Sequence, residues 1–208
     1  MKKKINLKSL LITTFICLLP IFLGMLMYQD LPDKLPGHFN FKNEVDRYDP
    51  KWLVLFVYPL VMVVLNFVCS LAMDLSRDPE KKENKFNKVV RWFVPVLTCA
   101  LFIISVGTAL NFKYNVGSIV IAIIAIFFIL MGNYTPKMSY EDAKRSMNIV
   151  PKTEEAYKKL ARTMGYSFVI GGIAVFITAF IDPLVALGIL FGTCLVVAYY
   201  SIYYTVKS

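Results

Sequence analysis

The sequence predicts an all-α integral membrane protein of six transmembrane helices, with both termini cytoplasmic and an ordered extracellular loop after the first helix. Hydrophobic residues make up 57% of the 208 residues and charged residues 18%, against about 45–50% and 25% in soluble domains. A soluble domain of this length could not bury that much apolar surface. The composition also excludes disordered, collagen-like and disulfide-rich classes, and it predicts a single membrane domain over residues 1–208.

Six uncharged hydrophobic runs have, or nearly have, the length of about 20 residues that crosses a bilayer. The first run is long and no small-x-small cleavage site follows it, so we expect it to remain as a helix and not to be a removed signal peptide. The runs are Leu10–Tyr28, Trp52–Met73, Trp92–Leu110, Val116–Met131, Tyr166–Ile181 and Leu184–Tyr204.

The orientation follows from the distribution of lysine and arginine. With the N-terminus inside, 18 of these residues lie in inner segments and 5 in outer segments, which is the distribution that the positive-inside rule requires. The extracellular loop is then residues 30–51, and the cytoplasmic loops are residues 74–91 and 133–165. This distribution explains the net charge of +9 without nucleic acid, so the expected surrounding partner is membrane lipid.

Local signals mark the ends of several helices. Asp49 and Pro50 are typical of an N-cap followed by proline at the first helical position. Thr153 indicates the start of a helix that continues into the fifth run. Asp182-Pro183 predicts a tight outer turn between the last two helices. Three further prolines are expected to kink helices or to lie near their starts: Pro20, Pro59 and Pro95.

Small and polar residues inside the runs predict contacts between helices. Asn66 and Asn111 could each join helices by hydrogen bonds. Small residues, which allow close helix approach, occur as Gly171-Gly172 in the fifth run and as the GxxxG pair Gly188 and Gly192 in the sixth. Packing within the chain is favoured for them over a homodimer face. The cysteines show no CxxC spacing and are read as small apolar residues: Cys17, Cys69, Cys99 and Cys194.

The sequence lacks the usual signs of catalysis, transport and metal binding. HExxH, GxSxG and phosphate-binding glycine loops are missing, so we expect no enzymatic activity and no cofactor. Glu154-Glu155 is superficially similar to the paired glutamates of CAAX-type proteases, but the later histidines are missing. The runs carry no charge, which argues against transport. His38 is the single histidine, whereas a zinc site usually needs several histidine or cysteine ligands, so we expect no metal site. We expect His38 to fix the outer loop by a hydrogen bond.

The outer loop is the most informative polar segment. Its aromatic alternation predicts a hairpin across residues 38–48 that turns near Lys42-Asn43. An unstructured connector of this length would be unusual, and long loops are often functional. A recognition surface is therefore favoured over a solvated connector.

Two segments resemble a known family. LPDKLPGHFNF with the later Asp46 and Lys51 resembles the LPDKIPxHFNxxGxxDxxxxK signature of a bacterial outer-loop domain, with Asn43 near the expected glycine. GNYTPK, which begins at Gly132, resembles the GNYLPK motif of the SdpI-type immunity proteins. The segment AYKKLARTMGYSFVIGG is similar to NWRKTHRxxGxxxVxGG of that family. The residues of these motifs to which we give a structural role are Pro32, Pro36, His38, Gly132, Asn133, Pro136, Arg162 and Gly165.

The sequence also departs from the family pattern. The segment GIRTPWTL has no recognisable counterpart in residues 146–153. Tyr157 stands at the position of the family's tryptophan and Ala161 at that of its histidine. If those cytoplasmic residues transmit a signal in the family, we expect this protein to have lost or changed that signal. We further expect Asn133 to cap exposed carbonyls at the end of the fourth helix.

The resemblance implies a multi-pass immunity protein of the bacterial cytoplasmic membrane, which protects a producing cell from its own secreted antimicrobial peptide. In this hypothesis the peptide docks on residues 35–48, where aromatic anchors supply most of the binding energy. The alternative is a membrane sensor or accessory subunit that binds a cytoplasmic regulator. The candidate peptide contacts are Phe39, Phe41, Glu44, Asp46 and Tyr48.

Overall fold

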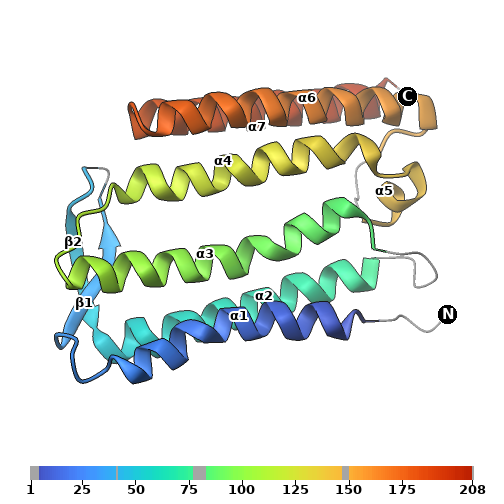
Figure 1. Ribbon diagram of the computed structural model, residues 1–208. Helices are drawn as coiled ribbons and strands as arrows, with labels where there is room; N and C mark the ends of the chain where they lie inside the picture. The colour runs from blue at the N-terminus through green and yellow to red at the C-terminus, as the bar shows by residue number, and fades with distance from the viewer. Residues whose placement is uncertain (1–4, 41, 77–82, 147–149, 208) are drawn as a thin grey trace. The chain divides into compact units, whose positions relative to one another are not determined.

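The computed structural model describes residues 5–40, 42–76, 83–146 and 150–207, and within them it contains six helices long and apolar enough to cross a membrane (Figure 1). The chain is therefore a multi-pass membrane protein. "Outer" and "inner" below denote the sides predicted from the charge distribution. The long helices are α1 (Leu7–Leu26), α2 (Tyr58–Ser76), α3 (Lys85–Ala109), α4 (Val116–Tyr134), α6 (Glu154–Ala179) and α7 (Pro183–Val206).

The chain falls into two compact units. The hairpin unit comprises Ile5–Ala72 and Arg91–Val120. The C-terminal unit comprises the described residues of Met73–Val90 and Ile121–Ser208. Each unit has its own buried apolar clusters, and the two are described separately below.

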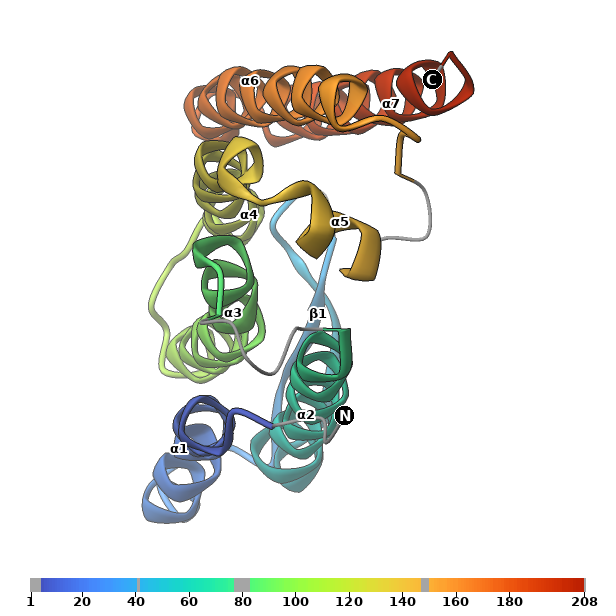
Figure 2. The ribbon, with the colours of Figure 1, turned by 90° about the vertical axis from the view of Figure 1, so that its right-hand side faces the viewer.

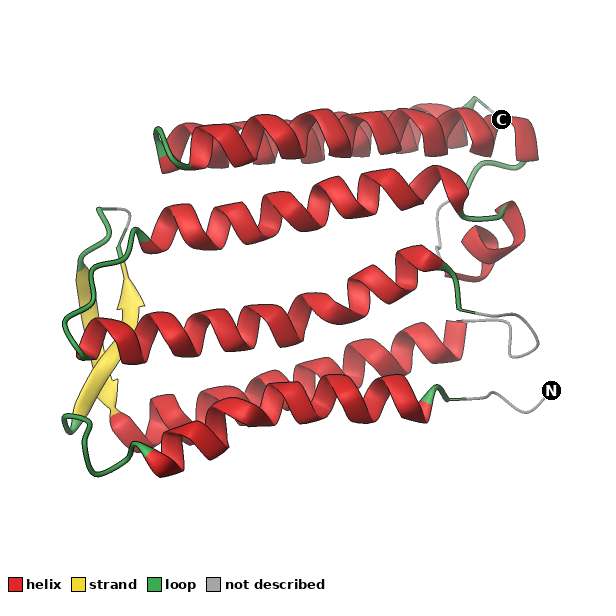
Figure 3. Ribbon diagram, in the orientation of Figure 1, coloured by secondary structure: helices red, strands yellow, loops and turns green. Residues whose placement is uncertain are grey.

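In the hairpin unit, two antiparallel strands connect α1 to α2 at the outer end of the helices (Figure 3). They are β1 (Lys34–Phe39) and β2 (Val45–Pro50). The predicted hairpin is present, and its strands extend further toward both helices than expected. Its base rests on a buried cluster from the loop, β1, the turn Leu53–Val57 and α3: Leu31, Leu35, Val54, Leu55, Phe102 and Val106.

The start of the second span corrects one expectation. Asp49 and Pro50 belong to β2, and the Asp49 carboxylate accepts a hydrogen bond from the Tyr58 hydroxyl at 2.6 Å instead of capping a helix. A π-helical turn, η1 (Leu53–Val57), precedes α2. Pro59 lacks an N–H for the Leu55 carbonyl and its ring crowds that carbonyl, so the wider turn at this position is physically reasonable.

Polar residues inside the hairpin unit have two different roles. The Asn66 side chain is buried and donates to the hydroxyls of Thr13 and Thr14, both at 3.2 Å, so the predicted interhelical bond is present. Asn111 is exposed and has a φ of 68°. It ends α3 in the left-handed conformation that asparagine tolerates, so the expectation that it joins helices was wrong.

In the C-terminal unit, α6 and α7 lie side by side and antiparallel, as the short turn at Asp182 predicted (Figure 2). The Asp182 carboxylate caps α7 by accepting from the Leu184 N–H at 2.8 Å. The Thr153 hydroxyl likewise caps α6, whose 26 residues continue from the inner segment into the span as predicted. The buried cluster is Ile121, Ala125, Val175, Ala179 and Ala186.

The glycines of the last two spans do not all pack as expected. A Cβ on Gly171 or Gly172 would lie within 3 Å of Thr193 or Ile129 atoms, which confirms close packing there. A Cβ on Gly188 or Gly192 would meet no heavy atom of the described chain within 4 Å. The packing expected for this GxxxG pair was therefore wrong within the described chain, where Thr193, the neighbour of Gly192, makes the close approach to Gly171 of α6 instead.

The inner segment between α4 and α6 contains two elements that the sequence analysis did not predict. They are the 3-10 turn η2 (Thr135–Lys137) and the short helix α5 (Tyr140–Ser146). The Tyr157 hydroxyl of α6 donates to the Met138 carbonyl at 3.1 Å. These elements share a small buried cluster of Met138, Ala143, Tyr157 and Ala161.

The predicted orientation can be tested by cysteine labelling in intact cells, in a background without the four native cysteines. Lys42 lies at the exposed hairpin turn and Glu141 on the exposed side of α5. An impermeant maleimide should label Lys42→Cys and should label Glu141→Cys only after the membrane is permeabilised. Labelling of Glu141→Cys from outside would reverse the orientation.

Candidate functional site

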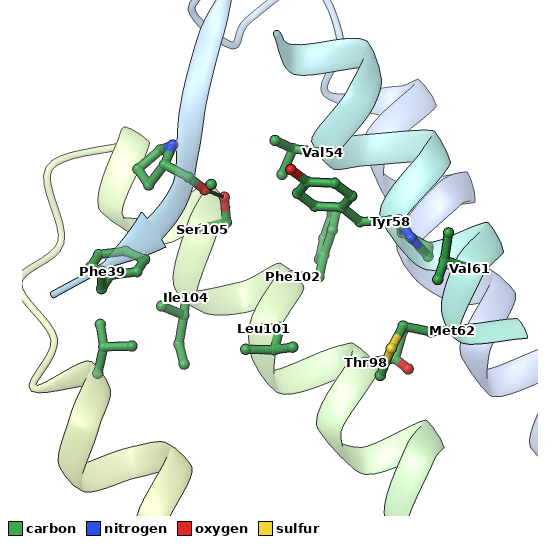
Figure 4. A pocket seen from close by; sticks show the side chains of 14 residues that line it. Phe39, Val54, Tyr58, Val61, Met62, Thr98, Leu101, Phe102, Ile104 and Ser105 are labelled. Carbon is green, nitrogen blue, oxygen red and sulfur yellow. Dashed lines mark hydrogen bonds between the residues drawn. The ribbon is translucent and has the colours of Figure 1, made fainter. Parts of the chain in front are cut away.

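The outer hairpin is held together by an irregular strand register. Leu35 pairs with Asp49 and Pro36 with Tyr48, whereas two irregularities occur between Pro36 and Phe39. Such bulges turn side chains away from regular alternation. Phe39 follows the second irregularity, and its side chain lines the apolar cavity described below (Figure 4).

The hairpin turn is built from asparagine side chains. The Asn40 side-chain oxygen accepts from the N–H groups of Lys42 at 2.8 Å and Glu44 at 3.0 Å. Asn43 has a φ of 62°, in the left-handed region. Its side-chain oxygen also accepts from the Gly117 N–H at 2.8 Å, which attaches the turn to the first residues of α4.

Three further polar contacts fix the base and the face of the hairpin. The Ser105 hydroxyl of α3 donates to the Pro36 carbonyl at 2.5 Å. Asp49 lies 3.1 Å from the Arg47 guanidinium, and its charge raises the pKa of Arg47. His38 Nδ1 lies 2.6 Å from Asp46 Oδ1 and joins the two strands. The hydrogen bond expected to fix the loop through His38 is therefore present.

An apolar cavity of about 410 Å³ lies beneath the hairpin. This volume falls within the range of about 300–1,000 Å³ that is typical of small-ligand sites. Figure 4 shows β1 on one side of it and the helices α2 and α3 on the others. The side chains that line it are largely aliphatic or aromatic, among them Phe39, Val54, Tyr58, Val61, Met62, Leu101, Phe102 and Ile104.

The cavity is open on one side, and the exposed lining residues show where. Val61 is 59% exposed and Leu101 is 42% exposed. Both belong to helices that are long and apolar enough to cross a membrane, so the opening lies between two such helices, α2 and α3.

Of the four candidate peptide contacts that the structure describes, one lies at this cavity. Phe39 lines it. Glu44 instead accepts from the Asn40 amide at the turn, Asp46 pairs with His38, and Tyr48 is exposed on β2. Phe41 lies outside the described residues. The helical lining residues were missed, because their apolar side chains do not differ in sequence from those that face lipid.

The inner motif residues occupy a second region. Gly132 and Gly165 approach closely, since a Cβ on Gly165 would lie 2.9 Å from the Gly132 carbonyl and 2.6 Å from Pro136. Asn133 is exposed and accepts from Lys137 Nζ at 3.1 Å, with α4 continuing to Tyr134. This contact replaces the expected helix cap. Arg162 is exposed on α6, and of the hairpin motif Pro32 is exposed and Pro36 buried.

Comparison with protein families matches residues 15–63 to a domain of unknown function, DUF1648. The match covers the outer half of α1, the whole hairpin and the beginning of α2. No curated protein and no solved structure gives a significant match. The matched region therefore coincides with the residues that form the hairpin and part of the cavity wall.

Proposed function

We propose that the protein is an SdpI-type immunity protein of the bacterial cytoplasmic membrane, which captures a secreted antimicrobial peptide at its outer face. The observation that carries this proposal is the apolar cavity beneath the ordered hairpin. The resemblance of the hairpin and of the GNYTPK segment to that family supports it. The mode of action is binding, and it needs neither a cofactor nor a catalytic group.

The cavity provides the binding energy in this proposal. A peptide that has entered the outer leaflet places one or two apolar side chains between α2 and α3, against Phe39 and Leu101. Buried aromatic and aliphatic anchors usually dominate such interfaces, each contributing about 2 kcal/mol or more. Capture at this depth holds the peptide beside the protein and keeps it from assembling in the bilayer.

The hairpin surface supplies the polar part of the contact. Glu44, Asp46 and Tyr48 are exposed there. The carboxylates attract a cationic peptide and the tyrosine ring offers an amphipathic contact area. Such rim charges act mainly on the rate of encounter, so their replacement should weaken protection less than loss of a cavity contact.

The direct test uses a peptide-sensitive strain that expresses only this protein. Phe39→Ala removes the aromatic contact from the cavity and should lower the tolerated peptide concentration by about 30-fold, since an anchor contributes about 2 kcal/mol and each 1.4 kcal/mol is a factor of about ten. Phe39→Ala together with Phe41→Ala should abolish protection. Membrane expression, followed by immunoblotting, should stay near normal.

The matched control lies on the opposite side. Replacing Lys144 and Arg145, both exposed on α5, by alanine should leave protection intact. Protection that survives the Phe39 change and fails with the α5 change would contradict capture. It would instead favour a sensor that binds a cytoplasmic regulator.

A further inference from the structure

The GNYTPK segment, residues 132–137, has two faces with different surroundings. Gly132 and Thr135 are buried and form its packed face: a Cβ on Gly132 would lie 2.7 Å from the Gly165 carbonyl, and the Thr135 hydroxyl donates to the Met131 carbonyl at 2.7 Å. Tyr134 and Lys137 point to the other side and line a pocket of about 330 Å³. The packed face explains the structural role of the motif but gives no role to the second face.

Two lysines from different elements meet at this pocket. Lys137 Nζ of η2 lies 4.9 Å from the centroid of the Tyr134 ring, and Lys85 Nζ at the first residue of α3 lies 6.0 Å from the same ring. A ring face attracts cations, so the Tyr134 ring is a common contact for both ammonium groups. Asn133 further positions Lys137 by accepting its hydrogen bond.

The rest of the lining fits an anion. The pocket includes Asn84, Lys85 and Phe86 at the beginning of α3, where the helix dipole presents partial positive charge. The Asn84 side chain accepts from the Asn87 N–H at 2.7 Å and so fixes this end of the helix. Among the described residues of the lining, one is acidic, Glu83, and two are lysines.

We propose that this pocket, formed by Lys85, Lys137 and Tyr134, binds a phosphate group, and that an anionic phospholipid headgroup supplies it. The predicted orientation puts the beginning of α3 and the end of α4 at the inner membrane surface. Anionic lipids are abundant on that side, and basic pockets beside transmembrane helices bind their headgroups. The Met138 side chain, also in the lining, offers an apolar contact for the glycerol region.

The test is a titration of the purified full-length protein in detergent, with bound adducts counted by native mass spectrometry. The probes are phosphatidylglycerol, phosphatidylcholine and inorganic phosphate. Phosphatidylglycerol should bind more tightly than phosphatidylcholine. Lys85→Gln with Lys137→Gln should weaken its binding about 25-fold, from about fivefold for each basic residue near a membrane surface. Binding of phosphatidylcholine should not change.

Two variants keep the result interpretable. Lys144→Gln with Lys158→Gln removes the same charge outside the pocket and should bind phosphatidylglycerol like the wild type. Lys85→Arg with Lys137→Arg retains both cations and should restore binding. Inorganic phosphate could bind as tightly as phosphatidylglycerol and lose its affinity in the glutamine variant. That result would support a phosphate site whose ligand is soluble phosphate and not a lipid headgroup. Equal lipid affinity in the glutamine variant and the wild type would overturn the proposal.

Discussion

Replacing Gly165 by alanine should lower the melting temperature of the purified protein in detergent. The new Cβ would lie 2.6 Å from Pro136 Cγ and 2.9 Å from the Gly132 carbonyl. The carbonyl is backbone and cannot move aside, so α4 and α6 must separate. Overpacking of this kind costs about 1–3 kcal/mol. The effect can be followed by differential scanning fluorimetry.

Gly188→Ala is the matched control, because it makes the same chemical change in another membrane-spanning helix. A Cβ there would meet nothing of the described chain within 4 Å, and alanine is favoured over glycine in helices by about 0.5–1 kcal/mol. The melting temperature should therefore stay level or rise slightly. Equal losses in both variants would show that the Gly132–Gly165 approach is not what makes Gly165 necessary.

Blocking the cavity should weaken protection without disturbing the fold. Val61 lies at the open side of the cavity and is 59% exposed. In Val61→Trp the indole ring can cover the opening without overpacking a buried site. If a peptide side chain must enter between α2 and α3, the tolerated peptide concentration should fall by roughly tenfold or more, as expected for loss of an anchor.

Val64→Trp is the corresponding control. Val64 is 62% exposed on the same helix and does not line the cavity. Both variants add the same ring to a lipid-facing position of α2, so any general effect on insertion should be shared. A loss of protection in both variants, or in neither, would argue against the cavity as the place of capture.

The spans were predictable because hydrophobic length is a property of the sequence itself. The capping roles of Thr153 and Asp182 could also be predicted from the sequence, since a capping side chain bonds to a backbone N–H within three residues of its own position. The prediction that Asp49 caps a helix was wrong, because its hydrogen-bond partner, Tyr58, lies outside the few residues on which a capping pattern is based. The sequence Asp49-Pro50 is compatible both with an aspartate that caps a helix and with one that holds a strand against a helix.

The cavity could not be predicted from the sequence. Leu101 and Ile104 line it, whereas Ile103 between them is 57% exposed and does not. All three are aliphatic residues in a membrane helix, where the surroundings are apolar whether lipid or protein provides them. Phe39 was identified because it belongs to a water-facing segment, in which an aromatic residue is conspicuous. Gly188 and Gly192 were predicted to pack and do not. A spacing of small residues shows where another helix could approach closely, but not whether a helix of the same chain does so.

The three-residue connection between α6 and α7 has a consequence for where this protein can change. Only Phe180, Ile181 and Asp182 separate those helices, so in the predicted orientation the second half of the chain presents almost nothing to the exterior. In that orientation the other described outer segments are the hairpin and the segment between α3 and α4, both of which precede Val116. If the protein captures an external ligand as proposed, substitutions that alter its recognition should therefore fall in these two segments and not in the connection between α6 and α7.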